Sequence, residues 1–154
     1  MRCVSVRASL VEATIIELRA GGAALKERLV LWAGHPGPRA QVSSVIVPPQ
    51  EADIDFFHVP PAGMREVFDA LRPKRLAILA QVHSHPEDAF HSSADDDWAI
   101  VRYAGALSIV LPYFAATASA TNFLEQAAIF VLSSDDVWHP VARRDVRRVL
   151  EIAP

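Results

Sequence analysis

Two histidines stand two residues apart in the segment His83-Ser84-His85-Pro86, which follows the apolar run Arg75 to Val82. Successive side chains of a strand point to opposite faces, so His83 and His85 are expected to point to the same side. Pro86 ends the strand and leaves both imidazoles at the rim of a sheet, where open α/β sheets place ligand sites. Two converging imidazoles favour a divalent metal, and zinc is the commonest choice for nitrogen ligands.

The acidic run Asp95-Asp96-Asp97 at the start of the next helix is the expected source of a third ligand. Asp96 is well placed, because a catalytic zinc takes three protein ligands and keeps a fourth position for water. The same stretch also matches a helix cap, in which Ser93 caps the helix and Asp96 folds back onto it. Two alternatives stay open: a set shifted by one residue, Ser92 with Asp95, and replacement of Asp96 by Asp97.

The composition limits the classes of protein to which the chain can belong. It has 154 residues, 51% of them hydrophobic and 21% charged, which predicts one globular domain over residues 1–154 and excludes a disordered chain. The net charge of −3 gives no reason to expect a nucleic-acid partner. Cys3 is the single cysteine, so a metal must be held by histidines and carboxylates. We find no targeting signal and no membrane span, and we expect a cytoplasmic protein.

Periodicity and turn residues predict strands and helices that alternate along the chain. A helix is expected from Ser9 to Arg19, where Gly21-Gly22 ends it, another begins at Pro61, and a third runs from Ala94 to Tyr103. The arginine-rich turn at 142–148 is either an anion-binding patch or, as we favour, the solvated face of a short helix. Strands are expected at residues 2–7, Leu25–Ala33, Val42–Val47, Asp53–Val59, Arg75–Val82, Leu107–Leu111 and Ala127–Leu132, and a short apolar segment, Val149–Ile152, follows. This alternation predicts a mixed sheet with helices packed on it.

The spacing of these polar residues resembles the signature of the JAMM, or MPN-plus, zinc metalloproteases. His83-x-His85 is followed by seven residues, Ser93, two residues and Asp96, and Pro86 matches the proline of the family's His-Ser-His-Pro. The order of elements is similar from end to end. The resemblance implies an α/β (α+β) fold, with a mixed, mainly antiparallel sheet flanked by helices in an MPN/cytidine-deaminase-like three-layer arrangement. Gln81-Val82 departs from the aromatic pair that many members carry before the histidines.

The same resemblance implies a role for each site residue. One zinc ion per chain would be held by His83, His85 and Asp96. Glu27, which opens an apolar stretch ending in glycine, matches the family's catalytic glutamate and would act on water as general base. Ser93 would donate a hydrogen bond to the oxyanion of the reaction intermediate.

The substrate implied by the resemblance is a ubiquitin-like protein or its conjugate. Members with the intact motif are isopeptidases or peptidases that cleave at the C-terminus of such a protein, in deconjugation or precursor processing. Small prokaryotic members stand alone, and some accompany E1/E2-like partners in bacterial conjugation or phage-defence operons. Two other hypotheses are a non-catalytic MPN interaction scaffold and a metal-dependent hydrolase of a non-protein substrate.

Overall fold

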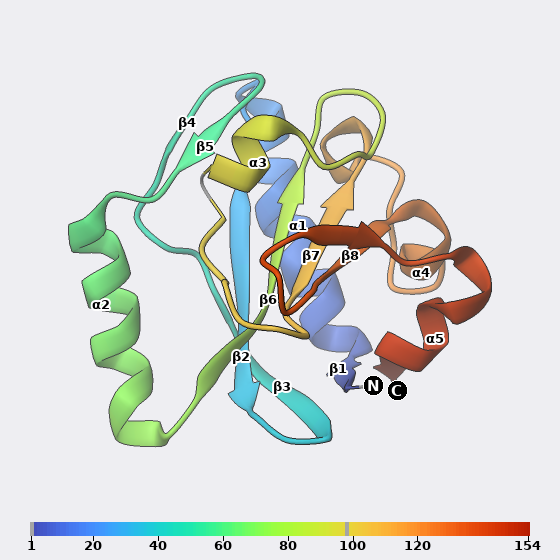
Figure 1. Ribbon diagram of the computed structural model, residues 1–154. Helices are drawn as coiled ribbons and strands as arrows, with labels where there is room; N and C mark the ends of the chain where they lie inside the picture. The colour runs from blue at the N-terminus through green and yellow to red at the C-terminus, as the bar shows by residue number, and fades with distance from the viewer. Residues whose placement is uncertain (1, 98) are drawn as a thin grey trace.

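A mixed sheet of eight strands forms the centre of the molecule, in the order β10-β1-β3-β2-β6-β7-β8-β9 (Figure 1). The computed structural model describes residues 2–97 and 99–154. Most neighbouring strands run antiparallel, but the pairs β1–β10, β1–β3 and β6–β7 are parallel. The expected fold class, a mixed and mainly antiparallel sheet flanked by helices, is therefore confirmed. The strands of this sheet are β1 (Cys3–Arg7), β2 (Leu29–His35), β3 (Arg39–Ile46), β6 (Ala77–Ser84), β7 (Leu107–Leu111), β8 (Ala128–Leu132), β9 (Trp138–Pro140) and β10 (Leu150–Ala153).

Helices cover both faces of the sheet, as their positions in Figure 1 show. Helix α1 (Ala8–Ala23) packs on one face and α2 (Pro61–Leu71) on the other. The central strand β2 serves both layers, because Trp32 joins the core on the α1 side and Leu31 joins the core on the α2 side. Both side chains are fully buried, as a strand covered on both faces requires.

The end of α1 differs from the expectation, because Gly21 and Gly22 lie inside the helix and do not end it. The helix closes with two backbone bonds, from the Leu25 N–H to the Gly22 carbonyl (2.9 Å) and from the Lys26 N–H to the Gly21 carbonyl (3.1 Å). This Schellman pattern puts Leu25 in the left-handed region, at φ 54°. Strand β2 therefore begins only at Leu29, and Glu27 lies in the connection that precedes it.

Short elements gather at the end of the sheet where β6 finishes (Figure 1). In place of a single strand over Asp53–Val59, the chain forms a hairpin of β4 (Glu51–Ala52) and β5 (Phe57–His58). The helix expected from Ala94 to Tyr103 is only α3 (Ser93–Asp97), and Trp98 lies outside the described residues. The remaining short elements of the described chain are spread over the molecule. They are α4 (Phe123–Gln126), α5 (Val146–Val149) and 3-10 turns at Arg72–Lys74, Tyr113–Ala115 and Arg143–Asp145.

The arginine-rich segment has the solvated face that its pattern predicts. Arg144 and Arg148 are exposed, whereas Val146 and Val149 are buried against the sheet. Within residues 2–97 and 99–154, no helix combines the length and the apolar character needed to cross a membrane.

Candidate metal centre

The two histidines of the His-x-His pair lie at the end of β6 and are buried. The strand has the predicted length but lies two residues further along the chain than the predicted Arg75–Val82, so it runs through His83 to Ser84. Pairing with β2 and β7 places His83 opposite Leu29 and Val110. The backbone of His85 is held beyond the strand, because its N–H donates to the Leu111 carbonyl at 2.9 Å. Both imidazoles therefore come from a rigid part of the sheet.

Asp95 of α3 places its carboxylate between the two imidazoles. Its Oδ1 lies 3.1 Å from Nε2 of His83, and its Oδ2 lies 3.3 Å from Nε2 of His85. One ligand atom from each of these three buried residues falls within 4.8 Å of the others. This set of two imidazoles and one carboxylate is the set from which a divalent metal site is built.

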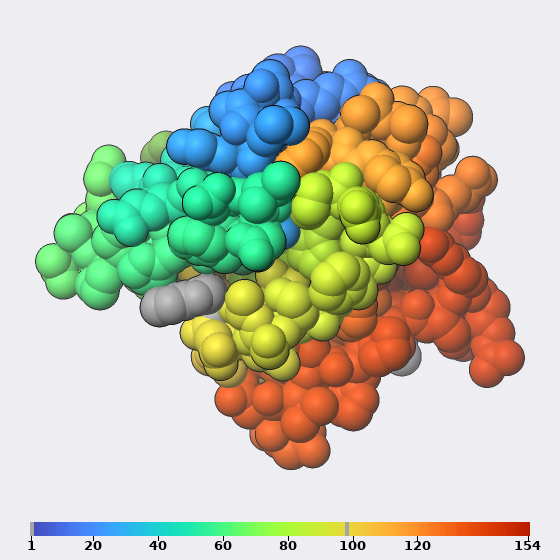
Figure 2. Space-filling view, turned by 90° about the horizontal axis from the view of Figure 1, so that it is seen from above, coloured from blue at the N-terminus to red at the C-terminus, as the bar shows by residue number. Residues whose placement is uncertain are grey.

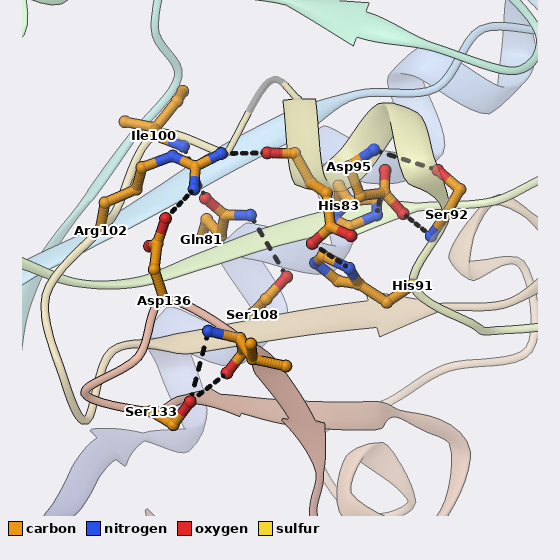
Figure 3. Close-up of polar contacts among 12 residues, drawn as sticks. Gln81, His83, His91, Ser92, Asp95, Ile100, Arg102, Ser108, Ser133 and Asp136 are labelled. Atoms are coloured by element: carbon orange, nitrogen blue, oxygen red, sulfur yellow. Dashed lines mark hydrogen bonds and ion pairs between the residues drawn. The ribbon is translucent and has the colours of Figure 1, made fainter.

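The structure places Asp95, not Asp96, beside the histidines. Ser92 precedes α3, and its hydroxyl accepts the Asp95 N–H at 3.1 Å, while the Asp95 carboxylate accepts the Ser92 N–H at 2.7 Å (Figure 3). These reciprocal bonds form a capping box with Ser92 as the cap. One helical residue turns the side chain by about 100°, so Asp96 faces outward, 60% exposed, and lies 3.4 Å from His91.

The shift by one residue applies to the serine as well. Ser93 is exposed as the first residue of α3, whereas Ser92 is half-buried next to Asp95. The geometry therefore matches the alternative pair Ser92/Asp95. The decisive feature is the length of the connection after His85, which holds six residues before the capping serine. Sequence spacing alone does not show which serine of a Ser-Ser pair caps the helix.

Glu27 approaches the same centre from the connection between α1 and β2. Its Oε1 lies 3.8 Å from Nε2 of His85, and the residue is only 4% exposed. The Glu27 N–H donates to the Asp53 carbonyl at 2.8 Å, which ties this residue to the hairpin β4–β5. The structure thus brings the expected glutamate to the histidines, although Glu27 precedes the strand in which it was predicted.

Several polar atoms of this cluster are buried without a partner. Asp95 lies close to His83, but the atoms are not aligned for a hydrogen bond, and neither ring nitrogen of His83 has one among the described residues. Oε2 of Glu27 is likewise without a hydrogen bond in the described part of the chain. Buried polar atoms usually have partners, and a metal ion would satisfy such free lone pairs. The residues present therefore fit a bound divalent cation.

Burial and charge shift the pKa values of the cluster in different directions. Burial raises the pKa of Glu27 to about 8, against the opposing effect of His85. Burial also opposes ionisation of Asp95, but its contacts with His83 and His85 outweigh that effect and hold its pKa well below the usual range. Burial lowers the pKa of His83, which favours the neutral imidazole that binds metals.

A left-handed turn after β7 supports the second histidine. Tyr113, Phe114 and Ala115 all have positive φ, at 55°, 51° and 59°. Such conformations cost about 1–3 kcal/mol each for residues other than glycine and persist only where the surroundings impose them. Here the Phe114 N–H donates to the His85 carbonyl at 2.8 Å, and the Tyr113 N–H donates to the Glu87 carbonyl at 3.0 Å. The strained turn therefore fixes the chain on both sides of Pro86.

Aromatic rings surround the polar cluster. Phe57 of the hairpin lies against His83, with ring centroids 5.0 Å apart, and Phe90 lies edge-on to His85 at 4.5 Å. The ring of His91 packs against Phe130 and Trp138, with ring centroids 5.1 and 5.3 Å apart. Seen from the end of the sheet, the hairpin β4–β5 and the segment around α3 lie next to each other on the surface (Figure 2).

Comparisons with known proteins agree with these features. No family model matches the sequence. The probable metalloprotease y4jG of Sinorhizobium fredii (strain NBRC 101917 / NGR234) is 29% identical over 157 residues, which cover 99% of this chain and 95% of that protein. The solution structure of protein DSY2949 from Desulfitobacterium hafniense is similar with a TM-score of 0.71, over 97% of this chain and 92% of that one. Its sequence is 14% identical, so this likeness shows the fold alone.

Proposed function

We propose that the protein is a zinc-dependent peptidase or isopeptidase of the JAMM type, which cleaves at the C-terminus of a ubiquitin-like protein. The similarity to a probable metalloprotease and the cluster of His83, His85 and Asp95 support a metal-dependent hydrolase. The observation that carries the proposal is the buried convergence of these three residues on one point, with Glu27 beside them. Zinc and the isopeptidase activity rest on the resemblance of the motif.

The residues of the cluster divide the chemistry between them. His83, His85 and Asp95 would hold the metal, which would polarise the scissile carbonyl and make water a better nucleophile at neutral pH. Glu27 would accept the proton of the attacking water and deliver it to the leaving amine. Its buried position beside His85 keeps bulk water away from this proton transfer.

Ser92 takes over the role that the motif assigned to Ser93. Its hydroxyl oxygen already accepts the Asp95 N–H, so its own hydrogen stays available for donation. A hydrogen bond from Ser92 to the oxyanion would stabilise the transition state by about 3 kcal/mol. Ser93, exposed on the outer side of α3, would have no part in the reaction.

The preference for an extended C-terminal tail is supported by the surroundings of Glu27. The short hairpin β4–β5 is tied to the Glu27 backbone and contacts His83 through Phe57. A short strand beside a reactive centre suits a substrate that binds in extended form through its backbone. A flexible ubiquitin-like tail has this form, and E1/E2-like proteins and a cytoplasmic setting remain predictions that go with such a substrate.

The test uses purified protein loaded with one equivalent of zinc. The probes are fusions of ubiquitin-like domains that end in Gly-Gly, joined to a reporter through a peptide or an isopeptide bond, with casein as the unrelated protein. We expect mass spectrometry to find cleavage after the terminal glycine, and a chelator to stop it. Glu27→Gln should retain one zinc per chain and lose turnover.

Each other outcome points to a different conclusion. Activity retained in Glu27→Gln, or a wild-type protein that does not bind zinc, would overturn the proposed mechanism. Cleavage of casein alone would remove the ubiquitin-like specificity. Inactivity on every protein probe, with zinc bound, would favour a hydrolase of non-protein substrates. A protein that binds no metal and keeps its function after substitution of His83 and His85 would support the hypothesis of a non-catalytic MPN interaction scaffold.

A further inference from the structure

The side chain of Gln81 links β6 to the segment that follows α3. It lies two residues before His83, so it shares the face of β6 from which the histidines project. Its Oε1 accepts the Ile100 N–H at 2.9 Å, with the Val101 N–H at 3.4 Å. Its Nε2 donates to the hydroxyl of Ser108 on β7 at 3.2 Å (Figure 3). Since Gln81 is fully buried, water does not replace these bonds.

The helix that carries Asp95 depends on such outside contacts. Helix α3 has only five residues, which is too short to be stable by its own backbone bonds. On its N-terminal side the Ser92 cap holds it. Among the described residues, the hydrogen bonds on its C-terminal side include those of Gln81 and of Arg102, which donates to the Asp96 carbonyl and pairs with Asp136. Arg102 and Asp136 are exposed, whereas Gln81 is fully buried, so its bonds to Ile100 and Val101 are the ones shielded from water among these described hydrogen bonds.

We infer that Gln81 is a positioning residue that holds Asp95 at the two histidines and thereby sets the metal affinity of the site. The Ser108 hydroxyl fixes the orientation of the carboxamide, so that its oxygen faces Ile100. The same segment of chain then supplies the two imidazoles and Gln81, the residue that holds Asp95 beside them. This inference rests on the proposed function only for the presence of a metal.

The deciding variant is Gln81→Met, which keeps the length of the side chain and removes its hydrogen bonds. Substitutions behind metal ligands typically lower affinity by about 10–100-fold, and we expect a loss in this range for zinc measured by competition with a chromophoric chelator. Cobalt in place of zinc should show a changed visible spectrum in Gln81→Met, because the carboxylate no longer holds a fixed place.

A matched control separates positioning from general stability. Gln50 also binds backbone groups, since its Oε1 accepts the Leu29 N–H at 2.7 Å and its Nε2 donates to the Leu29 carbonyl at 2.9 Å. In the described part of the chain its hydrogen bonds go to Leu29 and Pro48 and not to α3, so Gln50→Met should lower the melting temperature and leave the zinc affinity within about twofold of wild type. Equal loss of affinity in both variants would assign the effect to stability and overturn the inference.

A measurement on the wild-type protein does not depend on how the variants fold. Coupling between two sites is reciprocal, so zinc bound by Asp95 should strengthen the bonds from Ile100 and Val101 to Gln81. Hydrogen exchange of these two amides should therefore slow by about 5–150-fold on zinc addition, which corresponds to a coupling of about 1–3 kcal/mol. Unchanged exchange in a zinc-loaded protein would refute the role of Gln81 while leaving the metal site intact. A wild-type protein that binds no zinc would instead refute the proposed function.

Discussion

The Nε2 atom of His83 lies 3.1 Å from Oδ1 of Asp95, and both side chains are closed off from solvent. A neutral imidazole and a carboxylate at this distance, without a hydrogen bond between them, make a preformed pair of metal ligands. This relationship depends on which of three consecutive aspartates turns inward.

Replacing Asp95 by Asn should weaken zinc binding by more than about 100-fold. The loss should exceed the one expected for Gln81→Met, because Asp95 would bind the metal directly and carries a negative charge. Asp96→Asn, the matched control, should bind zinc as the wild type does, since the Asp96 carboxylate faces solvent. Equilibrium dialysis with metal analysis measures both. The reverse ranking of the two variants would return the ligand role to Asp96.

Ser92→Ala should lower kcat by about 10²–10³-fold, with a small effect on KM, because its hydroxyl acts on the transition state. Ser93→Ala should keep full activity. Some loss of helix stability is expected from the missing cap at Ser92, about 1 kcal/mol, so both variants are assayed well below their melting temperatures. If Ser93→Ala shows the larger loss, the shifted pair is the wrong one.

The sequence was sufficient to predict most strands of the sheet, the helices α1 and α2 and the His83/His85 pair. These follow from periodicity and from the proline that ends the strand, which are local features. The sequence predicts Asp96 as the third ligand, with Asp95 as the alternative, whereas the structure places Asp95 there. The difference depends on whether Ser92 or Ser93 caps the helix, and neighbouring residues of the same type carry no local signal that distinguishes them. The role of Gln81 depends on contacts with residues about 20 positions away, which no local pattern contains.

The metal-free protein should respond to pH through Glu27. Folding raises the pKa of this carboxyl from 4.5 to about 8, so the folded state binds its proton more tightly. The stabilisation is complete below pH 4.5 and is lost as the pH rises through 8. Glu27→Gln lacks this titration, so its stability relative to the wild type should rise by more than about 1 kcal/mol over that interval.

Urea unfolding in the presence of a chelator, at several pH values from 4.5 to 8, measures this difference. Taking the difference between the two proteins removes the titrations of His83, His85 and Asp95 to first order. A difference that does not change with pH would show that Glu27 is ionised in the folded apoprotein at neutral pH.

Leu25→Gly should stabilise the protein by about 1 kcal/mol, because Leu25 occupies a left-handed position and its side chain is 64% exposed. For a chain of this size the melting temperature should rise by about 2–4 °C. The neighbouring Ala24, at φ −94°, provides the control, and Ala24→Gly should lower the melting temperature. Similar effects of both glycines would contradict the assignment of strain to Leu25.

The end of helix α1 packs closely against the left-handed turn at Tyr113–Ala115. Residues of α1 can therefore affect the metal ligands, although they are distant in sequence. A methyl group on Gly22 would stand 2.3 Å from the Cβ of Phe114, whose N–H donates to the His85 carbonyl. A side chain at this position therefore requires Phe114 or the helix to shift, and a shift of Phe114 would disturb its hydrogen bond to His85. A substitution at residue 22 would act as a remote mutation of the metal centre, through backbone displacement and without any change in a ligand.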